Sequence, residues 1–210
     1  MSTLTYILQY KIVAIMRGMP AKDAVHLANA LHKGGINILE ITLNSPNALQ
    51  VIEALSQQFK DKMLIGAGTV LTAQEATDAI NAGAQFIISP ALDTDVIKTT
   101  KNAGKVSIPG AYTPTEIILA HRSGADIIKV FPAPNAAYIK NVLAPLNQLK
   151  LMPTGGVNVD NIKDYAAAGA VAFGIGSALV NSKEEVNDLY LQNLEDKARR
   201  FTGAVHSTAV

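Results

Sequence analysis

Residues 12–44 read IVAIMRGMPAKDAVHLANALHKGGINILEITLN. The two ends of this stretch, residues 12–18 and 38–44, are short aliphatic runs of the kind found in buried parallel strands. The segment between them has apolar residues at helical spacing and ends in Gly34 and Gly35, which favour a left-handed helix end. We therefore predict a strand–helix–strand unit with parallel strands.

The same alternation continues along the chain. Six further strand-like runs occupy residues 63–70, 85–90, 106–111, 126–132, 150–157 and 171–177. Several intervening amphipathic stretches end in a glycine, namely Gly83, Gly104, Gly124 and Gly169. Helix starts are expected at Thr72, at Thr113 with Pro114 and Glu116, and at Ser45 with Pro46. Eight strands alternating with helices predict an α/β fold, a (β/α)8 TIM barrel. A doubly wound open sheet is the alternative.

The alternation has no linker or low-complexity interruption, so we expect a single domain over residues 1–210. A short helix in residues 1–11 should lie across the barrel bottom. The last helix should run over residues 182–201, with a loose tail behind it.

Composition excludes several classes of partner and site. There are 18 Lys and Arg against 17 Asp and Glu, so the net charge of +1 gives no electrostatic basis for binding nucleic acid or an anionic membrane. The absence of cysteine rules out disulfides, thiolate metal sites and a cysteine nucleophile. The chain shows neither a signal-peptide pattern nor an apolar run of the ~18 residues that suggest a membrane span. A cytoplasmic location is expected.

Charged residues occupy inward-facing positions of two expected strands. Alternation along residues 38–44 turns Glu40 into the barrel together with Thr42 and Asn44. Alternation along residues 126–132 turns Lys129 inward with Ile127 and Phe131. The opposite faces, toward the helix layer, carry Leu39, Ile41, Leu43, Ile128 and Val130. A charge inside a packed barrel is costly and therefore requires an explanation.

A structural ion pair is one interpretation of Lys129 and Glu40. Against it, both residues lie toward strand ends that lead into βα loops, where barrel enzymes build their active sites. Apolar neighbours should lower the pKa of the Lys129 amine, and only a neutral amine attacks a carbonyl. We therefore favour Lys129 as a Schiff-base nucleophile, with Glu40 as the proton carrier.

Glycine-rich segments follow the last two expected strands. They contain Thr154, Gly155 and Gly156 in one case, and Gly174, Gly176 and Ser177 in the other. Glycine commonly makes turns, so either segment alone is a weak signal. At two consecutive strand ends of a barrel, however, they favour a phosphate site.

Arg17 and Thr69 end two other expected strands. Arg17 is either a fork for a substrate carboxylate or a solvent-facing residue of the barrel rim. Thr69 could offer a hydroxyl group to a ligand or could cap the following helix.

Seven motifs together resemble those of the KDPG/KHG aldolase family, in order and spacing, from about residue 10 to about residue 180. They are EITLNSP, GAGTVL, FIISP, IPGAYTPTE, KVFPA, PTGGV and GIGSALV. The resemblance implies a (β/α)8 barrel, a homotrimer, and class I aldolase chemistry without a metal or other cofactor. It also implies a phosphorylated keto acid as the partner, 2-keto-3-deoxy-6-phosphogluconate, cleaved to pyruvate and glyceraldehyde 3-phosphate. Some members of the family act on 4-hydroxy-2-oxoglutarate.

Carried over by position, the resemblance makes Lys129 the Schiff-base lysine and Glu40 the general acid and base. Thr69 matches a group near the pyruvate moiety, and Pro90 and Phe131 match pocket-lining residues. The phosphate cradle is matched by Gly155, Gly156, Gly176 and Ser177.

One position departs from the gluconate-type pattern. Those members carry an arginine four residues after the glutamate as a carboxylate ligand, where this chain has Asn44. Asn44 combined with Arg17 looks more like the branch that cleaves the galactonate epimer, with Arg17 taking over the carboxylate. The reaction type is unaffected, but the configuration at C4 is left open.

Rival functions find less support in the sequence. A phosphate-binding epimerase or isomerase would need histidine or acidic bases at several strand ends. The four histidines instead fall on expected helices or in the tail, where we expect them to be solvated: His26, His32, His121 and His206. A non-catalytic sugar-phosphate sensor would have no reason to bury Lys129, and no inward ligand cluster indicates a metal-dependent aldolase.

Overall fold

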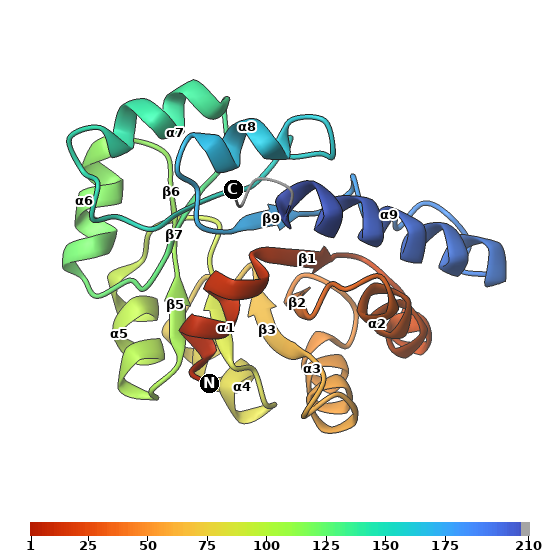
Figure 1. Cartoon of the computed structure of the whole chain (residues 1–210). Helices are drawn as coiled ribbons and strands as arrows, with labels where there is room; N and C mark the ends of the chain where they lie inside the picture. Colours follow the sequence, from red (N-terminus) through yellow and green to blue (C-terminus); the bar gives the residue numbers. More distant parts are fainter. Residues whose placement is uncertain (207–210) are drawn as a thin grey trace.

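The computed structural model describes residues 1–206, in which parallel strands alternate with helices (Figure 1). The strands are β1 (Ile12–Met16), β2 (Ile38–Thr42), β3 (Leu64–Gly68), β4 (Phe86–Ile88), β5 (Val106–Ile108), β6 (Gly110–Ala111), β7 (Ile128–Val130), β8 (Leu151–Pro153) and β9 (Phe173–Ile175). The helices are α1 (Thr3–Tyr10), the 3-10 turn η1 (Ala21–Asp23), α2 (Ala24–Lys33), α3 (Ala48–Gln58), α4 (Ala73–Asn81), α5 (Thr94–Asn102), α6 (Pro114–Arg122), α7 (Ala136–Leu143), α8 (Ile162–Ala167) and α9 (Asp188–His206).

The strands form two parallel sheets, one of six strands in the order β5-β4-β3-β2-β1-β9 and one of three in the order β6-β7-β8. The predicted parallel α/β fold is confirmed, but the strands are not one continuous ladder. Pro109 interrupts the expected fifth strand between β5 and β6, because proline has no N–H to donate. Between β8 and β9 the pairing is reduced to a single bridge, Thr154 with Gly174.

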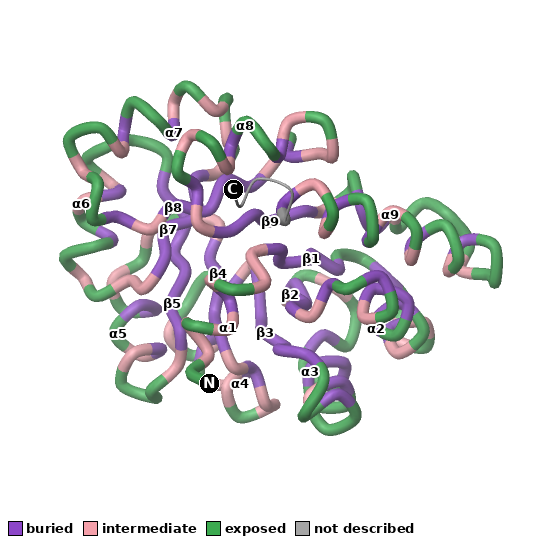
Figure 2. Tube along the Cα trace, in the orientation of Figure 1, coloured by how far each residue is buried: buried purple, intermediate pink, exposed green. Residues whose placement is uncertain are grey.

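The strands separate two apolar layers, as the alternation predicts. Leu39, Ile41, Ile128 and Val130 pack with the larger cluster between the strands and the surrounding helices. Ile127 belongs to a smaller cluster on the inner side. The buried trace accordingly follows the strands, and the exposed trace follows the outer faces of the helices (Figure 2). Glu40 and Lys129 are the two charged residues among the buried residues that the structure describes.

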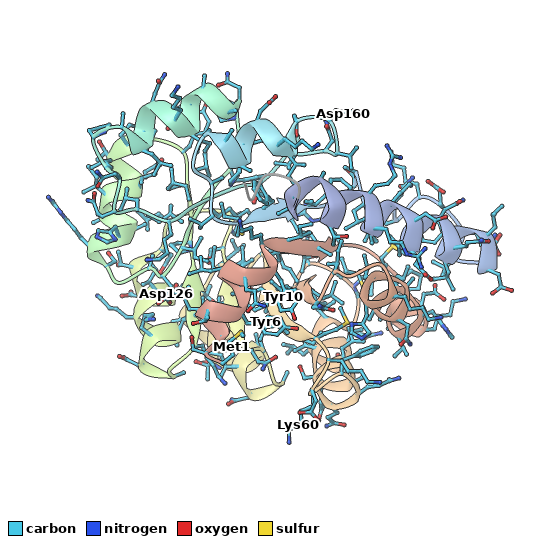
Figure 3. All side chains as sticks on the ribbon, in the orientation of Figure 1. Met1, Tyr6, Tyr10, Lys60, Asp126 and Asp160 are labelled. Carbon is cyan, nitrogen blue, oxygen red and sulfur yellow. The ribbon has the colours of Figure 1, made fainter. Side chains whose placement is uncertain are left out.

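The helix α1 closes the inner layer at one end, which agrees with the helix expected in residues 1–11. Its Ile7 is fully buried in the smaller cluster. On the same helix the rings of Tyr6 and Tyr10 lie with their centroids 4.4 Å apart (Figure 3). The Tyr6 hydroxyl donates to the carbonyl of Lys62, two residues before β3 begins at Leu64.

Most predicted helix ends are confirmed, and two need correction. Thr72 and Thr113 form capping boxes, and positive φ values occur at Gly35, Gly83, Gly104, Gly124 and Gly169. Gly34 is not left-handed, with φ of −79°. A Cβ there would lie 2.3 Å from the Cβ of Ala198, so this glycine allows α2 to approach α9. The expected helix start at Ser45 and Pro46 is wrong, because α3 begins after Asn47.

The last helix begins and ends later than predicted. Residues 182–187 are not helical, and Asn187 Oδ1 accepts from the N–H of Tyr190 in the first turn of α9. The helix then continues through His206, into the segment expected to be a loose tail. The rest of that expected tail, residues 207–210, lies outside the described residues. No helix within residues 1–206 has the length and apolar character needed to cross a membrane.

Candidate active site

Glu40 is a fully buried carboxyl group in the middle of β2. Neither of its oxygens has a hydrogen-bond partner among the described residues, which is rare for a buried polar group. Glu40 pairs with Gly66 of β3, but its side chain reaches Gly68, where a Cβ would lie only 1.7 Å from Glu40 Oε1. A glycine is thus needed to make room for the carboxyl group. Burial raises the pKa of Glu40, and the opposing charges of Lys129 and Arg17 act in the other direction.

Lys129 is the buried cation of the same inner face, carried by β7 and only 2% exposed. Its Nζ lies 4.8 Å from the centroid of the Phe131 ring. Burial lowers the pKa of Lys129; the charge of Glu40 opposes this effect and that of Arg17 adds to it. Burial therefore shifts the pKa of each group in the direction that favours its neutral form.

A cavity of about 490 Å³ opens beside Lys129 and contains most of the residues predicted for the site. The predicted residues that line it are Arg17, Lys129, Phe131, Thr154, Gly155, Gly156, Gly176 and Ser177. Glu40, Thr69 and Pro90 were also predicted but are not part of this lining. Glu40 lies beneath the surface, and Thr69 and Pro90 are half-buried at the ends of β3 and β4.

The glycine segments after β8 and β9 form one wall of the cavity. Gly155 and Gly156 have consecutive positive φ values of 85° and 77°, which only glycine adopts without strain. Thr154 Oγ1 is buried without a hydrogen-bond partner, and a Cβ on Gly174 would lie 2.3 Å from it. Small residues thus hold two backbone segments close together around an unsatisfied hydroxyl group, an arrangement that suits a polar ligand.

Several lining residues were missed by the sequence interpretation, above all Ser182 and Lys183. They belong to the turns after β9, where the sequence predicted a helix. Asn181 shapes this segment: its Oδ1 accepts from the Lys183 N–H at 3.1 Å, and its Nδ2 donates to Glu184. The cavity lining contains the basic side chains of Arg17, Lys129 and Lys183 and no carboxylate. The motif NSKEE contains no glycine or proline that could have indicated a turn here.

Asn44 and Thr69, which were expected at strand ends of the site, have backbone conformations that the strand alternation did not predict. Asn44 does not continue the inward face of β2, because the strand ends at Thr42 and the Ser45 N–H turns back to the Thr42 carbonyl. Asn44 is exposed in that turn. Thr69 has a φ of 58°, an unusual conformation for a β-branched residue. Thr72 rather than Thr69 caps α4.

The described residues offer no alternative base or metal cluster near the cavity. His26 and His121 are exposed as expected, whereas His32 is half-buried and bonds to Asn37 Oδ1 at 2.7 Å. The side chain of His206 lies outside the described part. Within the described range no three His, Cys, Asp or Glu residues are placed to share a metal ion.

A family model for KDPG and KHG aldolases matches residues 5–193. Two curated relatives support the same assignment. A probable 2-dehydro-3-deoxy-6-phosphogalactonate aldolase of Rhizobium meliloti is 35% identical over 182 residues, covering 85% of each chain. A 2-dehydro-3-deoxy-phosphogluconate aldolase of Haemophilus influenzae is 36% identical over 178 residues, covering 83% of this chain and 84% of its own.

Solved structures agree with these relatives. One described as native KDPGal superimposes with a TM-score of 0.88 at 31% identity, over 94% of this chain and 95% of the other. The KDPG aldolase of Legionella pneumophila, with pyruvate captured as a covalent carbinolamine, has a TM-score of 0.80 at 29% identity. That alignment covers 100% of this chain and 99% of the other.

Proposed function

The chain belongs to the KDPG and KHG aldolase family, and on that premise we propose that Lys129 performs its carbon–carbon chemistry. It is a class I aldolase, and hence a carbon–carbon lyase. The proposed substrate is a 2-keto-3-deoxy-6-phospho sugar acid, phosphogluconate or its galactonate epimer. The products are pyruvate and glyceraldehyde 3-phosphate.

The observation that carries this proposal is the pair of buried groups, Lys129 opening onto the cavity and Glu40 unsatisfied behind it. The neutral Lys129 amine adds to the C2 carbonyl to give a carbinolamine, and loss of water gives an imine. Cleavage of the C3–C4 bond leaves its electron pair on the imine as an enamine, and the C4 hydroxyl loses its proton as the aldehyde forms. Glu40 transfers a proton from the C4 hydroxyl to C3 of the enamine, and water then hydrolyses the resulting imine and releases pyruvate from Lys129.

The cavity wall provides complementary charges for the two anionic ends of such a substrate. We assign the carboxylate to Arg17, whose guanidinium can form a bidentate pair. The phosphate is assigned to the backbone of Gly155, Gly156 and Gly176 with Ser177, and Lys183 supplies the nearby positive charge. Thr154, Thr69, Pro90 and Phe131 are assigned to the substrate between these ends.

The configuration at C4 is the finer part of the proposal. Arg17 lines the cavity and Asn44 does not, which supports the carboxylate arrangement of the galactonate branch. The alternative substrate, 4-hydroxy-2-oxoglutarate, lacks a phosphate. It would leave the part of the cavity lined by Gly155 and Ser177 without an anion. We therefore rank the phosphorylated substrates first.

Borohydride reduction in the presence of pyruvate tests the mechanism. A covalent adduct should form on Lys129 and be absent in Lys129→Met; a label on another residue, or none, would refute the assignment. Parallel cleavage assays on the two phosphorylated epimers and on 4-hydroxy-2-oxoglutarate test the substrate. A kcat/KM that is highest for the unphosphorylated acid would contradict the phosphate site.

Three broader features complete the proposal. We propose that the two sheets are parts of one (β/α)8 barrel forming a single domain, supported by the Thr154–Gly174 bridge and by the 2.9 Å bond from the Lys129 N–H to the Pro109 carbonyl. A homotrimer in the cytoplasm is proposed from the family resemblance. Light scattering should then give three times the 22.2 kDa chain mass, and a monomer mass would contradict it.

A further inference from the structure

The turn that carries Arg17 is tied to the end of β2 by two hydroxyl groups. The N–H of Gly18 donates to Ser45 Oγ at 2.8 Å. Ser45 Oγ lies 2.9 Å from Thr42 Oγ1, which in turn donates to the Met16 carbonyl at 3.5 Å. These contacts hold the backbone on both sides of Arg17, at Met16 before it and at Gly18 after it.

The three contacts have one arrangement of protons that satisfies all of them. Ser45 Oγ accepts from the Gly18 N–H and donates its own proton to Thr42 Oγ1. Thr42 then uses its proton for the Met16 carbonyl. Each hydroxyl group both accepts and donates, so the relay leaves no member unsatisfied. Removing the Ser45 hydroxyl would leave the Gly18 N–H and the Thr42 oxygen without this partner.

Arg17 itself depends on this support because its side chain is exposed and makes no hydrogen bond or ion pair with another described residue. Gly18 has a φ of 66°, so the backbone turns sharply directly after the arginine. A side chain with many rotamers is directed mainly by its backbone when nothing else holds it. Thr42 follows Glu40 by two residues on β2. The same relay therefore joins the strand that carries Glu40 to the turn that carries Arg17.

We infer that Ser45 is a positioning residue for substrate carboxylate binding, acting through the turn that presents Arg17. The inference rests on the proposed function, in which Arg17 receives the carboxylate. It also gives a role to a residue that the sequence marked as a helix start but that caps no helix. Ser45 does not line the cavity beside Lys129, so its effect must pass through the turn.

The test measures steady-state kinetics of the whole enzyme on its phosphorylated keto acid. Ser45→Ala should raise KM about tenfold and change kcat less than about threefold, as expected when binding rather than chemistry is weakened. Ser45→Thr keeps the hydroxyl and should restore KM to within about threefold. Thr42→Val breaks the next contact and should raise KM in the same direction, which keeps the test open should Ser45→Ala fold poorly.

Ser56→Ala is the matched control. Ser56 Oγ donates to the Gly83 carbonyl at 3.2 Å, a link between α3 and the end of α4 that is away from the cavity. Ser56→Ala also removes a serine hydroxyl group, but away from the cavity. Its KM should therefore remain unchanged even if its melting temperature falls. An equal rise of KM in both variants would show a general loss of stability and would overturn the inference.

Comparison of Arg17→Ala with Ser45→Ala separates failure of the inference from failure of the proposed function, and the double mutant tests whether the two residues act together. If Arg17→Ala leaves KM unchanged, the carboxylate assignment fails, and the inference fails with it. If Arg17→Ala raises KM but Ser45→Ala does not, the inference alone is overturned. Adding Ser45→Ala to Arg17→Ala should raise KM no further, because the relay has no arginine left to position; a further tenfold rise would contradict this coupling.

Discussion

Replacing Gly68 with alanine should inactivate the enzyme by displacing the side chain of Glu40, although neither Glu40 nor Lys129 is itself substituted. The new Cβ would lie 1.7 Å from Glu40 Oε1, 2.4 Å from Cδ and 2.5 Å from Cγ. To reach an ordinary van der Waals contact of 3.4 Å, the carboxyl oxygen must move by about 1.7 Å. Glu40 is fully buried, so this movement displaces it from the position in which we propose that it carries protons for Lys129.

The expected loss follows from the size of that displacement. A misplacement of about 1 Å in an active site can cost about 100-fold in rate. We therefore expect kcat of Gly68→Ala to fall at least about 100-fold, which corresponds to about 2.7 kcal/mol of activation free energy. The rate of borohydride trapping with pyruvate should fall as well, since carbinolamine formation and dehydration need the same proton carrier.

Gly66→Ala is the control on the same strand. Its Cβ would lie 2.4 Å from the Phe86 ring instead of the carboxyl group, so overpacking should cost about 1–3 kcal/mol of stability with a much smaller effect on kcat. When Glu40→Gln is already present, adding Gly68→Ala should lower kcat by a further factor of less than about three. The reasoning is refuted if folded Gly68→Ala retains kcat within about threefold of the wild type.

Four further outcomes are expected. Lys129→Met should abolish cleavage. Because the folded pKa of Lys129 is lowered, the unfolded state binds more protons and wild-type stability rises with pH toward 10.5; the stability of Lys129→Met relative to the wild type should therefore be more favourable at pH 6 than at pH 10 in chemical denaturation, and a reversed trend would contradict the shift. Thr69→Gly should be about 1–2 kcal/mol more stable than Thr69→Ala, since only glycine relieves the left-handed strain, and equal melting curves would argue against it. Lys183→Gln should raise KM for the phosphorylated acid about tenfold but not for the unphosphorylated one, with the exposed Lys163→Gln as a neutral control. Activity should survive EDTA, and loss restored by a divalent metal would point to a different aldolase mechanism.

The pair proposed to be catalytic was visible in the sequence because strand periodicity is a local property. Alternation along residues 38–44 and 126–132 placed Glu40 and Lys129 on the apolar inner side, and the structure confirms both as buried. The glycines after β8 and β9 were visible for a similar reason, since few residues other than glycine tolerate the φ values found at Gly155 and Gly156.

Other parts of the site depend on where a strand stops, and the local pattern did not determine this. Asn44 was expected to face inward, but the Ser45 N–H bonds back to the Thr42 carbonyl and ends the alternation two residues earlier. Lys183 was expected on a helix, but Asn181 organises a turn that brings it to the cavity. Both outcomes are set by side-chain contacts with the backbone that compete with regular structure.

The sequence by itself determined the parallel α/β alternation, the family, and the two charges inside the apolar layer. Only the tertiary structure decided which residues share the cavity and how Arg17 is held. Ser45 is 27 residues from Gly18 in the chain, and their hydrogen bond exists only because β1 and β2 pair in a register that places Ile15 opposite Glu40. Periodicity records which side of a strand faces the core, whereas contacts between strand ends depend on register and turns that no single segment encodes.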